Sequence, residues 1–423
     1  MLRQMNTHVN PLLLCLILAT TSGCNQQDNL PLAKPENAGM SSEGLNRIRT
    51  VMQEYIDKNK LPGMITMVAR HGSIVHSETC GFMDADKPMR PDAIFRIASM
   101  TKPVTSVAVM ILYEEGYFRL DDPVADYIRE FRDMKVFSSI DKDGLHSVDQ
   151  ARPMTIRDLL THTSGLSGVG ADSPVDSMYA AADLSGGTLK DMVQKLSGIP
   201  LLYQPGTTWN YSRSTDVLGY LIEVLSGKPL DQFMKERIFI PLGMEDTDFY
   251  VPVEKLDRVG AVYAPDSVGI KIIIKPDTNS VSVLVKFLSG NGGLYSTATD
   301  YMIFSQMLLN KGKYNGIRIL KSRTVELMTT NQVSGMKMPD DEFLGPLMSG
   351  MGFGFGFAVL EDNVKAGITG SKGSYWWSGA GNTYFYIDPH EELIMILMTQ
   401  FVPNFHYPVF RQMRVLAYEA IID

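Results

Sequence analysis

The placement of its strand-like segments most constrains how this 423-residue chain can fold. Two strand-like runs, 64–69 and 74–79, lie near the start and are joined by a Gly-containing turn. Three more, 353–360, 383–387 and 393–399, lie near the end. Because strands from both ends of a chain must come together to pair, we expect one antiparallel sheet interrupted by an inserted domain.

Helical segments flank the strands and fill the sequence between them. Apolar residues recur at helical spacing over 41–60 and again at about 408–421, so helices are expected at both ends of the sheet domain. The expected fold class is α/β of the α+β type. We assign the sheet domain to 41–98 and 256–423, and the mainly helical domain to 99–255.

Four segments carry more specific expectations. The Gly-Phe alternation in 352–357 predicts one tightly packed strand. The segment 271–286 predicts a hairpin insertion that turns around 276–279. Helix signals continue over 114–131, whereas 163–187, rich in Ser, Gly, Ala and Asp, is expected to be a loop.

The N-terminus has the pattern of an export signal. A basic residue precedes an apolar core at 11–19, which is too short to span a bilayer, and small residues run up to Cys24. Small residues before a cysteine resemble a bacterial lipoprotein signal, which implies a signal peptide at 1–23, a lipid on Cys24 and a tether over 24–40. We therefore expect an exported, periplasmic protein that meets the membrane only through this lipid. A threonine stands where leucine is usual, so plain cleavage and a retained anchor remain alternatives.

The composition argues against several other functions. The net charge is −8 and no basic block interrupts it, so no nucleic-acid partner is expected. The seven histidines show no His-Glu-x-x-His or paired spacing, and we expect neither a metal nor another cofactor. Besides Cys15 and Cys24, Cys80 is left alone, which argues against a disulfide framework and predicts a buried structural thiol.

Ser99 and Lys102 stand at the start of a long apolar helix signal that includes 104–113. Because they are three residues apart on one helical face, the hydroxyl and the amine can meet, and a nearby amine can make a serine nucleophilic. The unpaired N–H groups at the helix start would also stabilise an oxyanion. Pro103 falls in the first turn, where a missing N–H costs little.

Ser-x-x-Lys alone is a weak signal because it fixes only two positions. It recurs at Ser139/Lys142 and Ser334/Lys337, in turn-prone sequence without a helix to hold the pair, and we expect these copies to be non-catalytic. Gly-x-Ser-x-Gly, the serine turn of α/β-hydrolases, does not occur. His162 is expected to be a structural residue at a helix end and not the base of a triad.

Two further stretches combine turn residues with aromatic residues. The first, 204–213, ends in Tyr211-Ser212-Arg213 just before a helix signal, where a tyrosine alone is more often an interface aromatic. The second, 373–382, contains Trp377-Ser378-Gly379 and leads into a strand. Its glycines indicate that backbone approaches another group closely, with a packed edge strand as the alternative.

Together these stretches resemble the motifs of a known family. Ser99-x-x-Lys102, Tyr211-Ser212-Arg213 and Trp377-Ser378-Gly379 follow the order and approximate spacing of S-x-x-K, Y-x-N and K-T-G in penicillin-recognising serine hydrolases. Three intervening phrases are similar as well: 120–124, 159–166 and 292–297. The resemblance runs from about residue 40 to the end. It is closest to the class C β-lactamase-like group, which includes esterases and D-alanyl peptidases.

The resemblance implies an α/β domain beside a helical domain, with the site between them. It implies that Ser99 is the acyl-accepting nucleophile and that Lys102 and Tyr211 are its proton-transfer partners. The backbone N–H groups of Ser99 and Ala380 would form the oxyanion hole. The side chains of free lysine and free tyrosine both have a pKa of about 10, so neighbouring groups must shift the pKa of one of them before it can act as a base. The sequence leaves open which of the two is the base.

Ser378 and Gly379 of the third motif are also expected to contact the substrate. Two departures from the family pattern affect which substrate we expect. Arg213 replaces an asparagine; it either recognises a carboxylate or, as we favour, points to solvent beside Asp216. Trp377 replaces a lysine and supplies no positive charge. A Trp-x-Gly third motif looks like the esterases of this group, which favours a carboxylesterase, or an acyltransferase, acting on a small-molecule ester. Hydrolysis of D-amino peptides or β-lactams, and a receptor that is acylated without turnover, remain alternatives.

Overall fold

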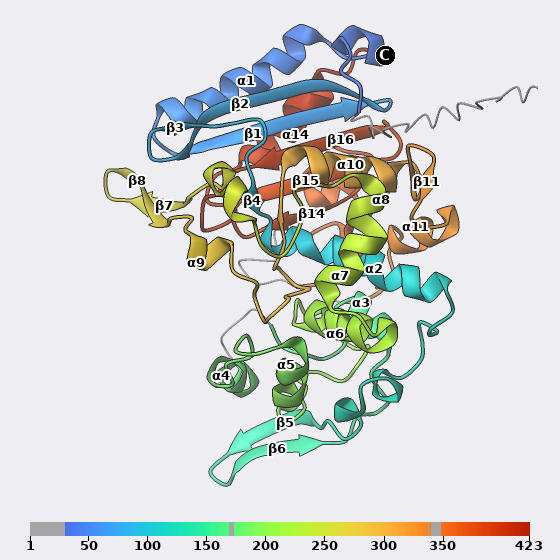
Figure 1. Ribbon diagram of the computed structural model, residues 1–423. Coiled ribbons are helices and arrows are strands. Elements are labelled where there is room, and N and C mark those ends of the chain that lie inside the picture. The colour runs from blue at the N-terminus through green and yellow to red at the C-terminus, as the bar shows by residue number, and fades with distance from the viewer. Residues whose placement is uncertain (1–29, 169–172, 337, 340–347) are drawn as a thin grey trace, which may run out of the picture.

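An eight-stranded antiparallel sheet organises the structure (Figure 1). The computed structural model describes residues 30–168, 173–336, 338–339 and 348–423. In the order β12-β13-β14-β15-β16-β1-β2-β3, the sheet joins β1 (Gly63–Arg70), β2 (Ser73–Asp84), β3 (Lys87–Pro88), β12 (Met351–Phe353), β13 (Ala358–Leu360), β14 (Tyr375–Gly379), β15 (Thr383–Asp388) and β16 (Leu393–Met398). Strand β1 pairs with β16 and sets Ile65 opposite Met398. The two ends of the chain therefore meet in one sheet, which confirms the expected fold class.

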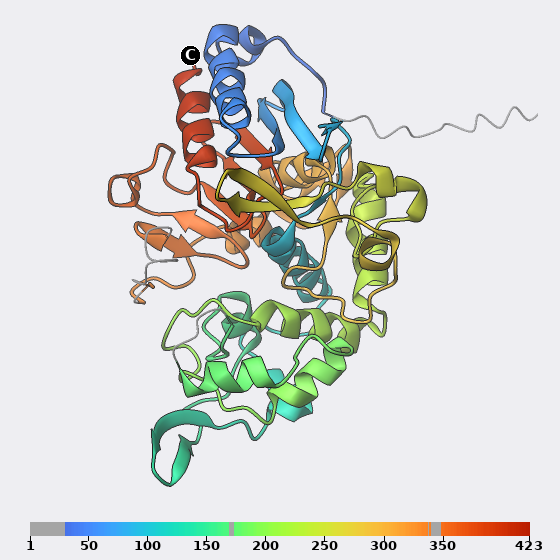
Figure 2. The ribbon, with the colours of Figure 1, turned by 90° about the vertical axis from the view of Figure 1, so that its left-hand side faces the viewer.

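Helices cover both faces of the sheet, as the side view in Figure 2 shows. On one face, α1 (Ser42–Asp57) packs against α14 (Val409–Glu419) and contacts β2. On the other, α10 (Ala298–Leu309) packs against β15 and β16. Strands β1, β15 and β16 are buried along their whole length because both faces of the sheet are covered.

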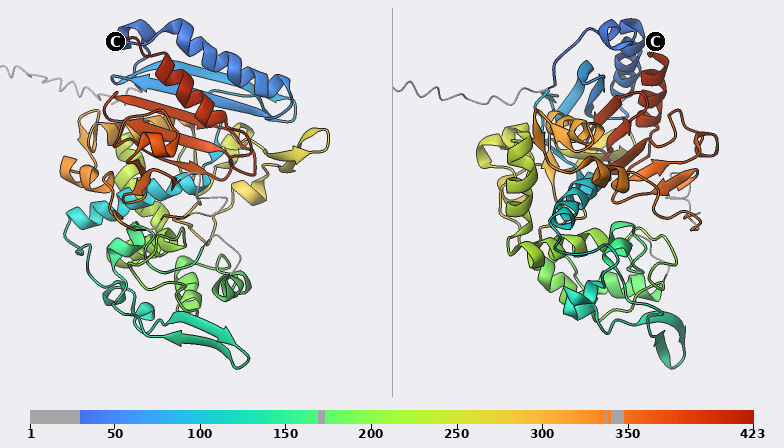
Figure 3. Two further views of the ribbon diagram at one scale, coloured as in Figure 1. Left: turned by 180° about the vertical axis from the view of Figure 1, so that it is seen from behind. Right: turned by 90° about the vertical axis from the view of Figure 1, so that its right-hand side faces the viewer.

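A second group of helices lies on the far side of α2 (Thr101–Glu114) from the sheet (Figures 1 and 3). It comprises α3 (Ile156–Leu160), α4 (Pro174–Ala181), α5 (Leu189–Leu196) and α6 (Ser214–Ser226), while α7 (Leu230–Met234) and α8 (Ile240–Leu242) lead back towards the sheet. Helix α6 contacts α2, α3 and α5, so α2 lies between the two parts of the molecule. The expected domain boundaries, 98–99 and 255–256, remain predictions.

The remaining described elements are short. They are η1 (Pro35–Ala38), β4 (Phe95–Arg96), η2 (Ala98–Met100), η3 (Val124–Asp126), η4 (Arg129–Phe131), β5 (Val136–Asp141), β6 (Gly144–Val148), η5 (Lys235–Phe239), η6 (Val253–Arg258), β7 (Val262–Asp266), β8 (Gly269–Ile274), α9 (Thr278–Val281), β9 (Tyr295–Ser296), β10 (Lys313–Tyr314), β11 (Ile317–Arg318), α11 (Ser322–Met328) and α13 (Asn363–Ala366). Within the described ranges, no helix has both the length and the hydropathy needed to cross a membrane.

Two glycine-rich or turn-rich segments differ from their predictions. Residues 353–360 form parts of two short strands, β12 and β13, and not one. Gly356 between them has φ +90°, and a Cβ there would overlap the Ser106 hydroxyl of α2, so the chain turns where it meets that helix. The prediction of a hairpin turning around 276–279 is wrong: the hairpin is β7–β8, which turns at 267–268, and Asp277 in the expected turn caps α9 instead.

Helix boundaries in the middle of the chain also differ. Helix α2 ends at Glu114, and Gly116 with φ +81° follows, so 114–131 forms no continuous helix. The expected loop 163–187 contains α4, whose start is capped by Ser173. The hairpin β5–β6 was not predicted.

Candidate active site

Ser99 and Lys102 lie together at the start of α2. Ser99 is in η2, and Lys102 is in the first turn of α2. The Lys102 Nζ donates a hydrogen bond of 3.0 Å to the Ser99 Oγ. Ser99 is half-buried, whereas Lys102 is 2% exposed. Ser99 therefore keeps some contact with solvent, while the amine lies in a water-poor environment that strengthens its polar contacts.

The backbone that leads into Ser99 is held on both sides. The Ile97 N–H donates to the Leu294 carbonyl over 3.1 Å, and the Thr383 hydroxyl donates to the Ile97 carbonyl over 3.2 Å. Ala98 has φ +44°. Such a conformation costs a non-glycine residue about 1–3 kcal/mol and is found most often at functional sites, where surrounding contacts offset it. The contacts at Ile97 supply that support.

The Lys102 amine has neighbours in three directions. It donates to the Asn291 carbonyl over 2.8 Å, contacts the Ser99 Oγ, and lies over the Tyr211 ring, with Nζ 4.4 Å from the ring centroid. An uncharged amine has two N–H groups and one lone pair. As an ammonium, Lys102 donates to Ser99; after it has lost a proton, the carbonyl and the ring face can keep its two N–H groups, and its lone pair can accept from the Ser99 hydroxyl. That is the arrangement a general base needs.

Tyr211 lies in the loop that enters α6, within a cluster of aromatic rings. The residue is 8% exposed, and its ring stacks against Trp209 with centroids 6.2 Å apart. Its hydroxyl accepts a hydrogen bond of 3.3 Å from the Trp377 Nε1. Among the described residues, the phenol makes no hydrogen bond with Ser99 or Lys102. The amine, and not the phenol, is therefore bonded to the candidate nucleophile.

Gly379 allows β14 to reach the backbone beside Ser99. A Cβ at this position would overlap the Ile97 carbonyl and the Thr383 hydroxyl. Strand β14 contacts η2 directly. Only a residue without a side chain permits this approach. The glycine of the third motif thus fixes the distance between the strand and the candidate nucleophile.

The other residues of the third motif have different surroundings. Trp377 is 6% exposed and its indole N–H points to Tyr211. The Ser378 hydroxyl accepts a hydrogen bond of 3.3 Å from the Asn404 Nδ2. Ala380 follows the end of β14 and is exposed. The roles of Ser378 in binding and of Ala380 in the oxyanion hole remain predictions.

Arg213 is bound to a buried carboxylate. Its Nη1 lies 3.1 Å from the Asp216 Oδ2, and its side chain is 29% exposed while that of Asp216 is fully buried. The guanidinium therefore lies beside Asp216, as expected, and it remains partly exposed to solvent. A buried charge needs a partner, so Arg213 balances the charge of Asp216.

His162 lies just after the end of α3 and has a structural position. It is 1% exposed, has φ +56°, and accepts a hydrogen bond from the Ser212 N–H at its Nδ1 over 3.3 Å. Burial, aided by the nearby Lys102 charge, lowers the pKa of His162 well below its ordinary value, so the ring is neutral. Among the described residues it has no hydrogen bond with Ser99.

Other sequence candidates lie outside this arrangement. Ser139 belongs to β5 and Lys142 to the turn before β6, and both are exposed. Lys337 lies outside the described residues, as do the expected signal peptide and Cys24.

Cys80 is free and partly buried, whereas a buried structural thiol was predicted. Within the described ranges, no cluster of three or more His, Cys, Asp or Glu side chains could hold a metal ion.

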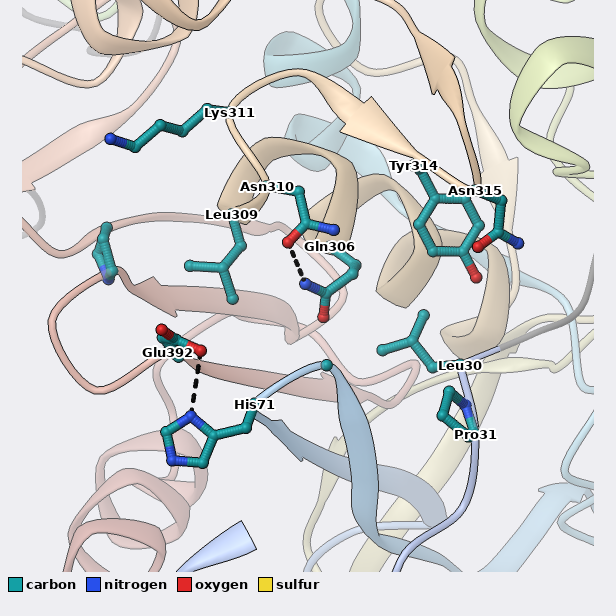
Figure 4. Close-up of a pocket in the computed structure, with 12 residues that line it drawn as sticks. Leu30, Pro31, His71, Gln306, Leu309, Asn310, Lys311, Tyr314, Asn315 and Glu392 are labelled. Carbon is teal, nitrogen blue, oxygen red and sulfur yellow. Dashed lines mark hydrogen bonds and ion pairs between the residues drawn. The ribbon is translucent and has the colours of Figure 1, made fainter.

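A hollow of about 840 Å³ lies away from Ser99 (Figure 4). It is formed by the turns at 71–72 and 389–392, the end of α10 and the start of the described chain. His71 bonds to Glu392 at one side, over 3.1 Å, and the Gln306 amide bonds to Asn310 at another, over 2.9 Å. None of the residues of the Ser-x-x-Lys site lines this hollow.

Sequence reasoning missed the residues behind Lys102. Asn291 supplies the carbonyl that accepts from the amine, and Asp216 holds the Asn291 N–H over 2.9 Å. The phrase 292–297 was recognised as part of the family resemblance, and the Gly-Asn-Gly-Gly sequence at 290–293, which overlaps its start, was the available signal. Asn291 makes both contacts through its backbone, so the identity of its side chain did not indicate this role.

A serine paired with a lysine one helical turn away, at the border between such a sheet and a group of helices, defines the serine hydrolases that act through a Ser-x-x-Lys helix. Comparison with protein-family models identifies the family within this class. Residues 48–418 match the Beta-lactamase family, and the chain belongs to it. The protein is a serine hydrolase of that family.

Individual relatives cover most of the chain. It is 34% identical over 367 residues to Protein Rv1367c of Mycobacterium tuberculosis, covering 84% of this chain and 89% of that protein. It is 30% identical over 379 residues to esterase EstB of Burkholderia gladioli, with coverage of 84% and 89%. The solved structure of EstCE1, a hydrolase with promiscuous acyltransferase activity, has a TM-score of 0.74 and 27% identity, covering 89% of this chain and 99% of that chain.

Proposed function

We propose that the protein is a carboxylesterase in which Ser99 is acylated by the substrate and Lys102 is the general base. The observation that carries the proposal is the 3.0 Å hydrogen bond between the Lys102 amine and the Ser99 hydroxyl, in a setting where the other N–H directions of the amine are already used. The similarity to esterase EstB supports an ester as the substrate.

The reaction proceeds in two halves. Lys102 takes the Ser99 proton while Oγ attacks the ester carbonyl, and the N–H groups of Ser99 and Ala380 stabilise the oxyanion. The Lys102 ammonium then returns a proton to the leaving alcohol, which yields an acyl-Ser99 ester. A water, or an acceptor alcohol in an acyltransferase reaction, then attacks this ester and gives its proton to Lys102, which passes a proton to the departing Ser99 Oγ, so that the acid or the new ester is released.

The charges beside Ser99 favour an uncharged ester. Trp377 stands where the family pattern has a lysine, and Arg213 is occupied by Asp216. The first position offers no cation for the carboxylate of a D-amino peptide or a β-lactam, and at the second the charge of the arginine is balanced by Asp216. These two substrate classes, together with a receptor that stays acylated, are the alternatives.

A substrate panel with wild type and Ser99→Ala tests this proposal. It contains a short-chain p-nitrophenyl ester, a D-Ala-D-Ala peptide and a chromogenic cephalosporin. We expect the ester to be hydrolysed and its turnover to fall by about 10³-fold or more in Ser99→Ala. Cleavage of the peptide or the cephalosporin with an inert ester would contradict the substrate class, and unchanged ester turnover in Ser99→Ala would contradict the nucleophile.

We also propose that the protein is exported and carries a lipid on Cys24, which holds it at the periplasmic side of a membrane. The support is the pattern of small residues before this cysteine after a short apolar core. Intact mass and detergent partition of wild type and Cys24→Ser test it. Wild type should be heavier by diacylglycerol and fatty acid, whereas equal masses after signal cleavage would contradict lipidation.

A further inference from the structure

Asp216 is a fully buried carboxylate that faces the loop behind Lys102. It lies in the first turn of α6 and has no exposed surface. Its Oδ1 accepts from the Ser289 hydroxyl over 2.7 Å and from the Asn291 N–H over 2.9 Å, and its Oδ2 accepts from the Arg213 Nη1 over 3.1 Å. Only one of these three partners is charged, so neutralising Arg213 explains only part of the arrangement.

The loop 289–293 is packed between α6 and α2. A Cβ on Gly290 would lie 2.6 Å from the Thr215 carbonyl of α6, so the two backbones are in close contact. On the other side, the Thr105 hydroxyl of α2 donates to the Gly290 carbonyl over 2.8 Å. The loop therefore has little freedom as long as its contacts with both helices persist.

Asn291 connects Asp216 of α6 to Lys102 of α2 through its backbone. Its N–H is held by Asp216, and its carbonyl accepts from the Lys102 Nζ over 2.8 Å. Without an acceptor at Asp216, the Asn291 N–H would lose its partner in a partly buried place, which is unfavourable. The residue would turn to find another partner, and its carbonyl would move away from the amine.

We propose that Asp216 is a positioning residue of the active site: through Asn291 it directs the Lys102 amine towards Ser99. The inference rests on the proposed function, because it gives Lys102 a task in proton transfer. The simpler reading is that Asp216 only neutralises Arg213 and stabilises the fold. The two readings differ in the kcat they predict for a folded variant of Asp216: it falls if Asp216 positions Lys102, and it is kept if Asp216 only stabilises the fold.

Asp158 offers a matched control. It is buried like Asp216, binds an arginine, Arg152, over 2.7 Å, and lies in the first turn of a helix, α3. No hydrogen bond joins it to the loop 289–293 or to Lys102 in the described part of the chain. Asp158→Asn should therefore lower the midpoint of thermal unfolding while kcat per folded molecule stays within about threefold of wild type.

The experiment compares full-length wild type, Asp216→Leu, Asp216→Asn, Asp158→Asn and Ser99→Ala by ester hydrolysis and thermal unfolding. Leucine has a similar size but no acceptor, whereas asparagine keeps one acceptor for the Asn291 N–H. We expect kcat to fall by about 10²-fold in Asp216→Leu, with KM within about threefold, because misplacement of a catalytic group by about 1 Å has that scale of effect. Asp216→Asn should lie between this variant and wild type.

The inference and the proposed function fail separately. If Ser99→Ala is inactive but folded Asp216→Leu keeps the kcat of Asp158→Asn, Asp216 is structural only and the inference is overturned. Should Asp216→Leu not fold, Asp216→Asn decides, and its failure to lower kcat below that of Asp158→Asn overturns the inference. Activity that persists in Ser99→Ala overturns the proposed function itself.

Discussion

The indole N–H of Trp377 donates a hydrogen bond of 3.3 Å to the hydroxyl oxygen of Tyr211. This bond joins β14 to the loop before α6, so it connects the second and third motifs across the border between the two parts of the molecule. An uncharged donor thus stands where the family pattern has a lysine. It can orient the phenol without adding a positive charge beside Ser99.

Removal of this donor should lower turnover without loss of the fold. Trp377→Phe keeps an aromatic ring but leaves the Tyr211 hydroxyl without its N–H partner, and we expect kcat for an ester to fall about tenfold, the scale of one hydrogen bond. Trp376→Phe is the control, because the Trp376 Nε1 is buried and has no hydrogen-bond partner among the described residues. Equal kcat in the two variants would show that the hydrogen bond from Trp377 to Tyr211 does not contribute to turnover.

Gly379→Ala should separate β14 from the nucleophile segment. The added Cβ would overlap the Ile97 carbonyl and the Thr383 hydroxyl, so we expect a loss of about 1–3 kcal/mol in the free energy of unfolding and a loss of ester turnover. Gly198→Ala is the control, since the nearest atom to a Cβ there, the Lys195 carbonyl oxygen, lies 3.6 Å away. A Gly379→Ala enzyme with wild-type turnover would show that the close approach of β14 is unnecessary.

Asp300 should make stability depend on pH. Burial raises the pKa of this carboxyl to about 6, although the Thr247 hydroxyl and the Asp246 N–H bond to it. Because the folded-state pKa lies above the unfolded one, its stabilising contribution is complete below about pH 4 and is lost as pH rises through about 6. Wild type should therefore lose up to about 3 kcal/mol relative to Asp300→Asn over this range. Urea unfolding of both proteins measures this, and a constant difference would contradict it.

Cys80 should react slowly with thiol reagents at neutral pH. Burial raises the pKa of the Cys80 thiol to about 11, so little thiolate is present. Site-resolved mass spectrometry after iodoacetamide treatment should find Cys80 mostly unmodified in the native protein and fully modified in urea. Rapid modification of native protein that retains activity would mean that the thiol is more accessible than its partial burial implies.

The sequence predicted the parts of the fold that depend on long patterns of side chains. The segments that became β1, β2, β15 and β16 alternate or are continuously apolar, and α1 and α14 have clear helical spacing, so the sheet and its terminal helices could be foreseen. The hairpin β12–β13 could not, because the turn at Gly356 depends on contact with the Ser106 side chain of α2. Tertiary contact, and not local propensity, sets that boundary.

The site was predictable to a similar degree. Ser99, Lys102 and Tyr211 were found from side-chain chemistry and motif order, and the structure brings them together. The link from Asp216 to Lys102 was missed because it passes through the backbone of Asn291, whose position only the folded chain defines. Arg213 was expected beside Asp216, but the complete burial of Asp216 depends on how α6 packs and could not be foreseen.

Intact-mass spectrometry during ester turnover, followed by peptide mapping, tests the central claim most directly. We predict a transient mass increase equal to the acyl group, located on Ser99, that decays as substrate is consumed and does not form in Ser99→Ala. An adduct on another residue, or undiminished turnover in Ser99→Ala, would contradict the account. An adduct on Ser99 that never decays would identify the acylated receptor instead of an esterase.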